Sequence, residues 1–421
     1  MSKSERGGLG GLLSVRNYRF LWSGDMSTSW AFEMENLILG WFILAQTESI
    51  FMLTLFGSLL YIGTLIAPIF GTIGDRIGHQ NLLCIMRGSY FFLALCLLIL
   101  SLFDQLTPVR VLMITGLTGL IRSSDLAIRG ALVTEIVPVK ILMSALSISR
   151  TTMDLARIAG ALSGAGLFVA LGFSFAYVIV LIFYLFGFVL TYLINKERLN
   201  RQEGAPDPSL SKDDGPFLVL GKGFRYVRTT PQLLAAMWVA FIVNLIAFPF
   251  CIGLLPFVAK NIYFTDQTGL GYMAASFASG ALIGSLALSV FGQKIRPARM
   301  MIIFSTSWCL LVACLGQTSS VTSGMIVLAM CGLSQSLGLL PLAMLLMRTS
   351  EIQYRGLVMG VRMLAIYGLP VGLLVSGFLI DRLGFEPTAM IYGFLGIFLI
   401  LLVVVRWHAI IWRLDAAANS I

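Results

Sequence analysis

The chain has 421 residues, of which 58% are hydrophobic and only 12% are charged, and its mean hydropathy is +0.90. Soluble globular domains carry about twice as much charge, so this composition excludes them and indicates an integral membrane protein. The net charge of +9 is not accompanied by basic and aromatic residues interleaved on a polar face, which excludes a nucleic-acid partner.

The apolar stretches predict an all-α integral membrane fold with 12 transmembrane helices, because one pass of a bilayer takes about 20 apolar residues. In chain order we expect helices near 17–45, 50–74, 81–103, 107–129, 142–170, 172–194, 232–258, 268–291, 299–316, 321–347, 354–380 and 386–408. The 42 glycines suit helices that pack closely in lipid.

The only long charged stretch lies between the sixth and seventh predicted helices. It divides the chain into an N-terminal six-helix half (1–194), a cytoplasmic linker (195–230) and a C-terminal six-helix half (231–421). Polar and proline-containing segments of this kind are typical of loops. The sequence therefore predicts two six-helix halves joined by a polar linker.

Basic residues are distributed very unevenly between the predicted loops. Of the 29 lysines and arginines, 21 lie at the termini, in the linker or in loops on that same side, and only Arg110, Lys260 and Arg382 lie on the other side. Positively charged loops stay in the cytoplasm. The sequence thus predicts a multi-pass protein of the cell (inner) membrane with both termini cytoplasmic.

The two predicted halves contain a weak internal repeat. A shift of 212 residues places 146–164 on 358–376, which pairs Arg150 with Arg362 and Gly160 with Gly372. Internal repeats in a helical membrane chain are typical of secondary transporters, whose substrate site lies between the repeats near the middle of the bilayer.

The loop after the second predicted helix reads GTIGDRIGH from Gly71 to His79. Its glycines allow a tight turn, and its carboxylate can meet an arginine or a helix N-terminus. This segment resembles the GxLaDrxGrk signature of the major facilitator superfamily, in which the loop latches the two halves in one conformation. The resemblance implies that conformational role for Gly71, Asp75, Arg76 and Gly78, with Arg129 as a candidate partner.

Two features depart from the family signature. His79 replaces the usual basic residue, and the equivalent second-half loop, GQKIRPARMM from Gly292, lacks the aspartate. The resemblance therefore implies a latch in the first half only.

Within the superfamily, the chain resembles the branch that contains the enterobactin exporter and other transmembrane secretion effectors. The segments that carry this resemblance are NYRFLW, RGALVTEIVP, LARIAG, GKGFRYV, IRPARMM and YRGLVMG. They imply export of a small, partly apolar molecule such as a siderophore or a drug. Antiporters of the family often have Gly-Pro in the fifth helix, whereas here Ala161 follows Gly160.

Eight charged residues lie inside the predicted helices 1, 4 and 5, namely Asp25, Glu33, Glu35, Arg122, Asp125, Arg150, Asp154 and Arg157. Each would cost about 2.5–3.5 kcal/mol in the middle of the bilayer if it faced lipid. We therefore expect these side chains to face protein or a water-filled cavity.

Helical spacing groups the charges of the fourth and fifth predicted helices into stripes. Arg150, Asp154 and Arg157 fall within about 60° of one another around the helix, and Arg122, Asp125 and Arg129 follow i, i+3, i+7 spacing. We expect the two stripes either to neutralise each other across the helices or to hold an anionic substrate. A static network that only locks the helices together is the structural alternative.

The carboxylates of the first predicted helix are candidates for proton coupling. Glu33 and Glu35 are about 200° apart on the helix and cannot both point into one cavity. We prefer Glu33 because it lies deeper than Asp25; Asp25, Glu35 and Asp154 are the alternatives. In the second half, the sequence offers Asn244, Gln335 and the single intrahelical charge Arg362 as further cavity residues.

Nothing in the sequence predicts catalysis or a cofactor. Only His79 and His408 are available as histidines, and the chain has no metal-ligand cluster, phosphate-binding loop or nucleophile elbow. The leading hypothesis is a proton-driven secondary exporter of a small molecule, with the lipid bilayer as its surroundings. The alternatives are uptake or facilitated diffusion of an organic anion, and a membrane receptor or scaffold without transport.

Overall fold

The computed structural model describes residues 12, 14–66, 70, 73–74, 76–195, 216–291, 296–351 and 354–417, and within these ranges it contains helices and no strand. The first group of helices consists of α2 (Arg16–Thr47), α3 (Ile50–Leu59), the 3-10 helix η2 (Ile62–Leu65), α5 (His79–Leu102), α6 (Pro108–Ile136) and α7 (Val139–Tyr192).

The second group follows helix α8 (Pro216–Thr229). It consists of α9 (Pro231–Phe248), the π-helix η4 (Pro249–Gly253), α10 (Leu255–Phe257), the π-helix η5 (Val258–Ile262), α11 (Gln267–Phe291), α12 (Pro297–Gly316), α13 (Val321–Thr349), α14 (Arg355–Ala365), α15 (Gly368–Leu383) and α16 (Phe385–Ala417). In the described part of the chain, nine helical stretches are long and apolar enough to cross a membrane.

The helix predicted at 50–74 is interrupted, because α3 ends at Leu59 and the 3-10 helix η2 follows; the later described residues of this range, 70, 73 and 74, are helical again. The reason is the close packing of this segment on α6. A side chain at Gly119 would overlap the carbonyl oxygen of Leu59, and one at Gly63 would overlap that of Leu120. The chain therefore leaves the helical path where two backbones touch.

The helix predicted at 354–380 is also divided, with α14 and α15 separated at Ile366 and Tyr367. The boundary expected between 142–170 and 172–194 does occur, at Gly172 inside α7, where φ is 77° and ψ is 178°. This positive φ is readily adopted by glycine, which has no Cβ.

The predicted linker 195–230 is not a loop throughout, since α8 occupies its last part. The Tyr226 ring stacks on Tyr354 with the ring centroids 4.3 Å apart, and a side chain at Gly223 would come within 3.1 Å of Leu357. Helix α8 is thus attached to the start of α14.

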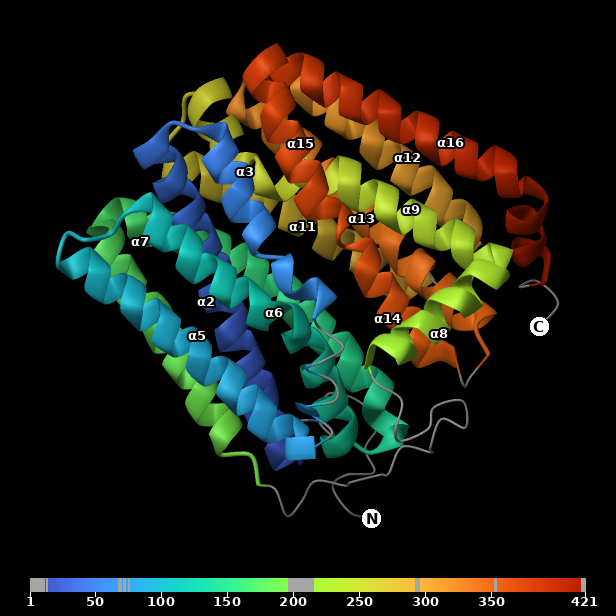
Figure 1. Cartoon of the computed structure of the whole chain (residues 1–421), viewed down its shortest axis with the longest axis horizontal. Coiled ribbons are helices and arrows are strands. Elements are labelled where there is room, and N and C mark those ends of the chain that lie inside the picture. Colours follow the sequence, from blue (N-terminus) through green and yellow to red (C-terminus); the bar gives the residue numbers. More distant parts are fainter. Residues whose placement is uncertain are drawn as a thin grey trace.

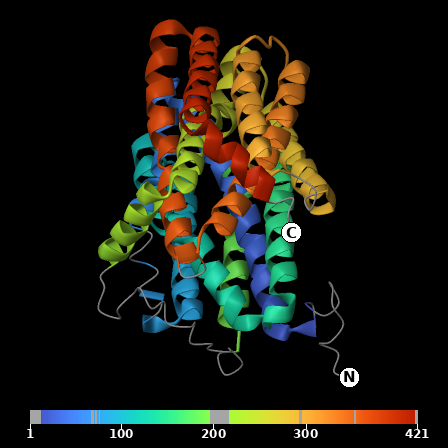
Figure 2. The same cartoon turned by 90° about the vertical axis from the view of Figure 1, so that its right-hand side faces the viewer.

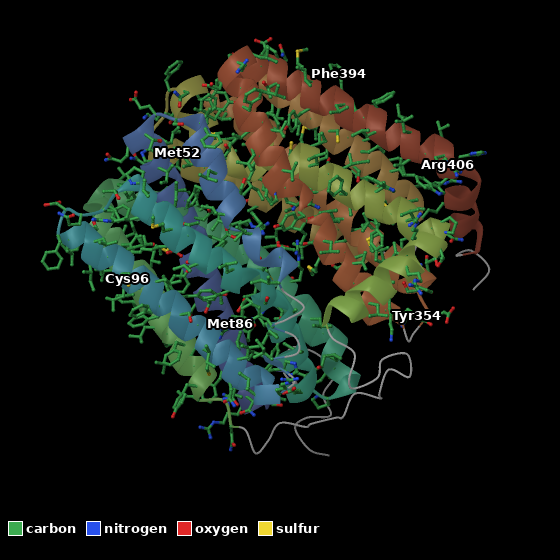
Figure 3. All side chains as sticks on the ribbon, viewed as in Figure 1. Met52, Met86, Cys96, Tyr354, Phe394 and Arg406 are labelled. Carbon is green, nitrogen blue, oxygen red and sulfur yellow. The ribbon has the colours of Figure 1, made fainter. Side chains whose placement is uncertain are left out.

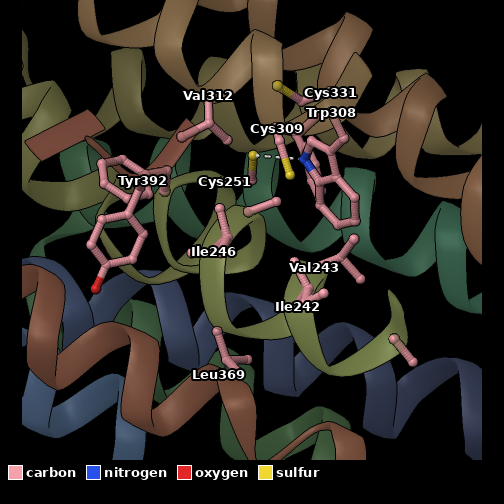
Figure 4. Close-up of a cluster of buried hydrophobic side chains, with 14 of the residues drawn as sticks. Ile242, Val243, Ile246, Cys251, Trp308, Cys309, Val312, Cys331, Leu369 and Tyr392 are labelled. Atoms are coloured by element: carbon pink, nitrogen blue, oxygen red, sulfur yellow. Dashed lines mark hydrogen bonds between the residues drawn. The ribbon is translucent and has the colours of Figure 1, made fainter. Parts of the chain in front are cut away.

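The two groups of helices lie side by side. Figure 1 shows α2, α5, α6 and α7 at the lower left and α9, α12, α13 and α16 at the upper right; in Figure 2, turned by 90°, helices of the two groups overlap in projection. The buried apolar residues form two clusters that follow this division for the most part. Figure 4 shows part of the cluster in the second group of helices, where the Trp308 indole N–H donates to Cys251 Sγ at 3.3 Å.

We call the end of the bundle at which the predicted basic loops lie the basic end, and the other end the opposite end. Contacts between helix termini mark each of them. At the basic end, Gln80 at the start of α5 donates to the carbonyl of Ile194, and Asn17 donates to the carbonyl of Asn195. At the opposite end, Ser101 hydrogen-bonds Ser174 at 3.0 Å.

Small residues bring the two groups together near the opposite end. On one side α3 contacts α15, where the Ser58 hydroxyl donates to the carbonyl of Pro370 at 3.1 Å. On the other side α7 contacts α11, where a side chain at Gly271 would lie 3.0 Å from the Ala161 carbonyl oxygen. Backbones approach closely at both contacts because no large side chain separates them.

Candidate functional site

The carboxylates of α2 form the centre of the candidate site, because arginines from three other helices contact them. Asp25 forms an ion pair with Arg87 of α5, and its second oxygen lies 3.7 Å from Arg129 Nε of α6. All three side chains are buried. A buried charge needs a partner of opposite sign. Asp25 is that partner for both arginines.

Arg129 therefore lies deeper than its predicted position at the end of the helix 107–129. Helix α6 continues to Ile136, which places Arg129 about two turns inside the helix end. Its guanidinium also contacts Met153 Sδ at 2.7 Å. The ion pair with Asp25, which the sequence did not predict, accounts for its burial.

Arg87 is a member of the site for which the sequence analysis gave no role. Besides Asp25, it donates to the Thr191 hydroxyl and, at 3.4 Å, to the carbonyl of Gly187, both on α7. The sequence signal for Arg87 is that it is a lone arginine in the apolar run 81–103, because ionisable residues inside a membrane usually have a functional role. Its partners lie far away in the sequence and are visible only in the fold.

Glu35 is held by two tyrosines of α7. The Tyr177 hydroxyl donates to one carboxylate oxygen, and the Tyr184 hydroxyl donates to the other at 2.6 Å. A cavity of about 10 Å³ lies beside Glu35, with Asn36, Thr115 and Thr118 among the residues that line it. This volume is the size of one water molecule, and the lining combines these polar residues with apolar ones such as Phe32 and Phe56.

Glu33 lies on another side of α2, as its angular separation from Glu35 predicted. Its carboxylate accepts a hydrogen bond from Arg157 Nε of α7 at 3.4 Å. The side chains are 21% and 23% exposed, whereas those of Asp25 and Arg87 are 6% and 1% exposed. Glu33 and Arg157 thus form an ion pair between two helices that is less buried than the pair of Asp25 and Arg87.

Glycines of α7 allow this pair to form. A Cβ atom at Gly160 would lie 2.7 Å from Glu33 Cβ, and one at Gly164 would lie 3.0 Å from Met34 Cα. The Trp30 indole N–H, one turn before Met34, donates to the Ser163 hydroxyl at 2.8 Å. The small-residue face of α7 therefore brings Arg157 next to α2.

Arg150 and Asp154 pair within α7, with Arg150 Nε 3.4 Å from Asp154 Oδ2. Asp154 is 1% exposed and neither of its oxygens accepts a hydrogen bond from a described residue, while the Arg150 side chain is 43% exposed. The predicted stripe on the fifth helix is thus only partly neutralised within itself.

The stripe on the fourth helix does not neutralise the one on the fifth. Arg129 is paired with Asp25, and the Arg122 guanidinium lies over the ring of Phe32. Asp125 is buried, and its Oδ1 has no hydrogen bond among the described residues. Arg129 of the first stripe and Arg157 of the second are paired instead with Asp25 and Glu33 of α2. This is possible because α2 packs against both α6 and α7.

The candidate residues of the second half are less strongly connected. The Asn244 amide donates to the Ala240 carbonyl of its own helix at 2.8 Å, and buried Gln335 has an amide oxygen without a hydrogen bond among the described residues. Arg362 is partly buried on α14 and has no ion pair within the described ranges. No hydrogen bond or ion pair joins these three residues to the α2 carboxylates in the described part of the chain.

The predicted latch is described only in part. Gly71 and Asp75 lie outside the described residues, whereas Arg76 is exposed and Gly78 has a φ of 89°. Next to them, His79 Nδ1 lies 2.6 Å from Glu135 Oε1 and joins the start of α5 to the end of α6.

Among the described residues, no group of histidine, cysteine and carboxylate side chains is arranged to hold a metal ion. The described ionisable groups of the site can exchange protons or bind a charged group of a ligand. Their arrangement on helices that pack in lipid fits transport.

Comparison with known proteins agrees with this interpretation. The family model described as Major Facilitator Superfamily matches residues 21–365. No curated protein matches the chain.

Several solved structures share the fold. A variant of the nucleoside transporter NupG aligns with a TM-score of 0.69 and 12% identity over 92% of this chain and 98% of its own. A POT family transporter in complex with 5-aminolevulinic acid gives 0.71 and 14% over 95% and 97%. The E. coli fucose:proton symporter FucP gives 0.62 and 16% over 91% and 97%. At these identities the similarity concerns the fold alone.

Proposed function

This chain belongs to the major facilitator superfamily and has the fold of its transporters, and we propose that it exports a small, partly apolar molecule in exchange for protons. Export follows from the sequence resemblance to the branch of secretion effectors. Proton coupling follows from the carboxylates of α2. The transport cycle is alternating access, in which the two groups of helices rock around a central site.

The observation that supports proton coupling is the partly exposed Glu33–Arg157 pair. The Asp25 side chain is buried next to two arginines, and the Glu35 side chain is buried next to two tyrosines. In contrast, about a fifth of the Glu33 side chain is exposed. A proton from solvent reaches an exposed carboxylate most easily. Protonation of Glu33 removes its charge and releases Arg157, which changes the affinity of the site for a substrate.

The membrane potential supplies the energy for this exchange. Moving one proton inward yields about 2.3 kcal/mol per 100 mV. The proposed orientation places the basic end in the cytoplasm of a cell whose inner membrane holds the protein. The proposed halves are residues 1–194 and 231–421, and the two buried clusters support that division.

The test uses purified protein in proteoliposomes with a pH gradient imposed in either direction and a mixture of siderophores and drug-like compounds. Substrate movement driven by the gradient is expected for the native protein and is lost in Glu33→Gln, which retains the fold. Glu48→Gln is the matched control, because Glu48 is exposed at the end of the same helix. Movement of each compound is measured by mass spectrometry.

Unchanged coupling in Glu33→Gln would exclude Glu33 as the proton site and leave Asp25, Glu35 and Asp154 as candidates. Absence of movement of every compound in both directions would contradict export of this class of molecule.

A second candidate function, uptake or facilitated diffusion of an organic anion, is favoured by the arginines that are unpaired among the described residues or are largely exposed. Arg122 and Arg362 have no ion pair among the described residues, and Arg150 is 43% exposed. Under this alternative, Arg362→Gln lowers the rate of anion movement and the pH gradient has no effect on it.

A further inference from the structure

An apolar groove of about 280 Å³ lies between α9 and α16, away from the charged pairs of α2. It is lined by Trp238, Phe241, Ile242, Leu245, Leu399, Leu402, Val403, Arg406 and Trp407. Its volume is close to the lower limit of ordinary small-molecule pockets. The groove therefore has room for part of an elongated apolar molecule.

The groove opens on the outer surface of the bundle. Trp238 and Leu402 are 48% and 49% exposed, so no other described part of the chain covers them. Since both helices belong to the membrane-spanning stretches, the molecule that fills the groove comes from the bilayer. Its walls consist of aliphatic and aromatic side chains, which accept a hydrocarbon chain.

A single charge stands at one end of this groove. Arg406 is exposed, has no ion pair among the described residues, and its guanidinium lies 5.6 Å from the Trp407 ring. The backbone of Trp407 is not helical, with φ of −122° and ψ of 20°, so α16 bends there. Figure 3 places Arg406 at the edge of the molecule near the far end of α16.

The level of Arg406 in the membrane follows from its neighbours. Trp238 lies about two turns from the start of α9 at Pro231, which is at the basic end. Tryptophan prefers the interface between hydrocarbon and water, and Trp238 and Trp407 line the same end of the groove. Arg406 is therefore at the height of the lipid phosphates of that leaflet.

We propose that this groove is a binding site for one anionic phospholipid, whose acyl chain lies between α9 and α16 and whose phosphate binds Arg406. A guanidinium forms charge-assisted hydrogen bonds with phosphate oxygens, and an anionic headgroup also neutralises its charge. A neutral hydrocarbon would leave Arg406 unpaired, and a free phosphate ion would leave the apolar walls empty. This site is separate from the proposed transport site and stands independently of the substrate.

The test measures lipid retained by the purified full-length protein in detergent by native mass spectrometry, with dioleoyl phosphatidylglycerol and dioleoyl phosphatidylcholine offered in equal amounts. One retained phosphatidylglycerol is expected. Arg406→Gln lowers its retention about fivefold, as expected for one basic residue near an anionic headgroup. Arg382→Gln leaves the retention of phosphatidylglycerol unchanged, because Arg382 does not line the groove. It lies in the last turn of α15, with its guanidinium over the Phe378 ring.

A second pair of variants separates the groove from surface charge. Leu402→Trp fills the groove and displaces the lipid, whereas Leu401→Trp does not, although Leu401 is equally exposed on the same helix and does not line the groove. Equal retention of the two lipids, no effect of Arg406→Gln, or equal behaviour of the two tryptophan variants would each overturn the proposal.

Discussion

The buried carboxylates Asp25 and Glu35 of α2 are stabilised by partners on other helices. Asp25 alone faces Arg87 and Arg129, and the carboxylate of Glu35 receives two tyrosine hydroxyls. Removing one member of such a group is costly because it leaves the others buried without compensation. The residues around α2 therefore determine stability as well as the proposed coupling.

Asp25→Asn is expected to destabilise the protein strongly. It leaves two buried guanidinium groups without their carboxylate, at a cost of about 3–5 kcal/mol. Thermal unfolding of the purified protein in detergent measures the loss. Asp104→Asn serves as the control, because Asp104 is exposed in a loop with a φ of 52°, which asparagine adopts well. A variant at Asp25 as stable as the native protein would show that the arginines find other partners.

Tyr184→Phe is expected to cost about 1–3 kcal/mol, because it removes the hydroxyl that donates to Glu35 and leaves a buried carboxylate oxygen unsatisfied. The same measurement of thermal unfolding applies. Tyr192→Phe, at a side chain that is 72% exposed on the same helix, should have no effect. Equal stability of the two variants would argue that water replaces the lost hydroxyl.

At the scale of helices, glycine positions decide how closely the elements approach. Gly160 and Gly164 place α7 against α2, and Gly119 places α6 against the end of α3. The ion pair of Glu33 with Arg157 depends on the first contact. Small residues therefore determine the geometry of the charged site without contributing any charge.

Gly160→Ala is expected to push α7 away from α2, since the added methyl group would lie 2.7 Å from Glu33 Cβ and 3.0 Å from the Trp30 carbonyl oxygen. Overpacking of this kind costs about 1–3 kcal/mol. Gly166→Ala is the control on the same helix, where a Cβ atom meets nothing within 4 Å. It should be neutral or stabilising by up to about 1 kcal/mol, because alanine favours helix. Comparison of the two unfolding temperatures tests the contact.

At the scale of the whole molecule, the two groups of helices meet near the opposite end through α3–α15 and α7–α11. Alternating access requires these contacts to separate during transport. The residues at these contacts are small, so few interdigitated side chains have to move when the two groups of helices separate.

A disulfide between Thr54→Cys and Gly377→Cys is expected to lock this end and stop transport. A Cβ atom at Gly377 would lie 3.1 Å from Thr54 Cβ, slightly below the usual separation in disulfides, so a small adjustment suffices. Transport of the compound found in the proteoliposome screen is measured after oxidation and again after reduction, which should restore it. The oxidised single variants are the controls. Transport at the native rate by the fully cross-linked protein would contradict the rocking motion.

Apolar run lengths, the charges within them and the loop at 71–79 were sufficient to predict a helical membrane protein of the major facilitator superfamily, because these features depend on local sequence. The partners of the charges were not predictable. Arg87 and the tyrosines around Glu35 come from helices far along the chain, and an aromatic residue in an apolar helix carries no signal of its own.

The sequence by itself determined which segments enter the membrane and which residues carry charge there, since the cost of burying polar groups in hydrocarbon applies to every residue alone. The tertiary structure decided which carboxylate meets which arginine, where α3 and α14 end, and that Glu33 is about a fifth exposed while Asp25 is buried. These properties depend on how closely helix backbones approach, and that distance is a property of two helices together.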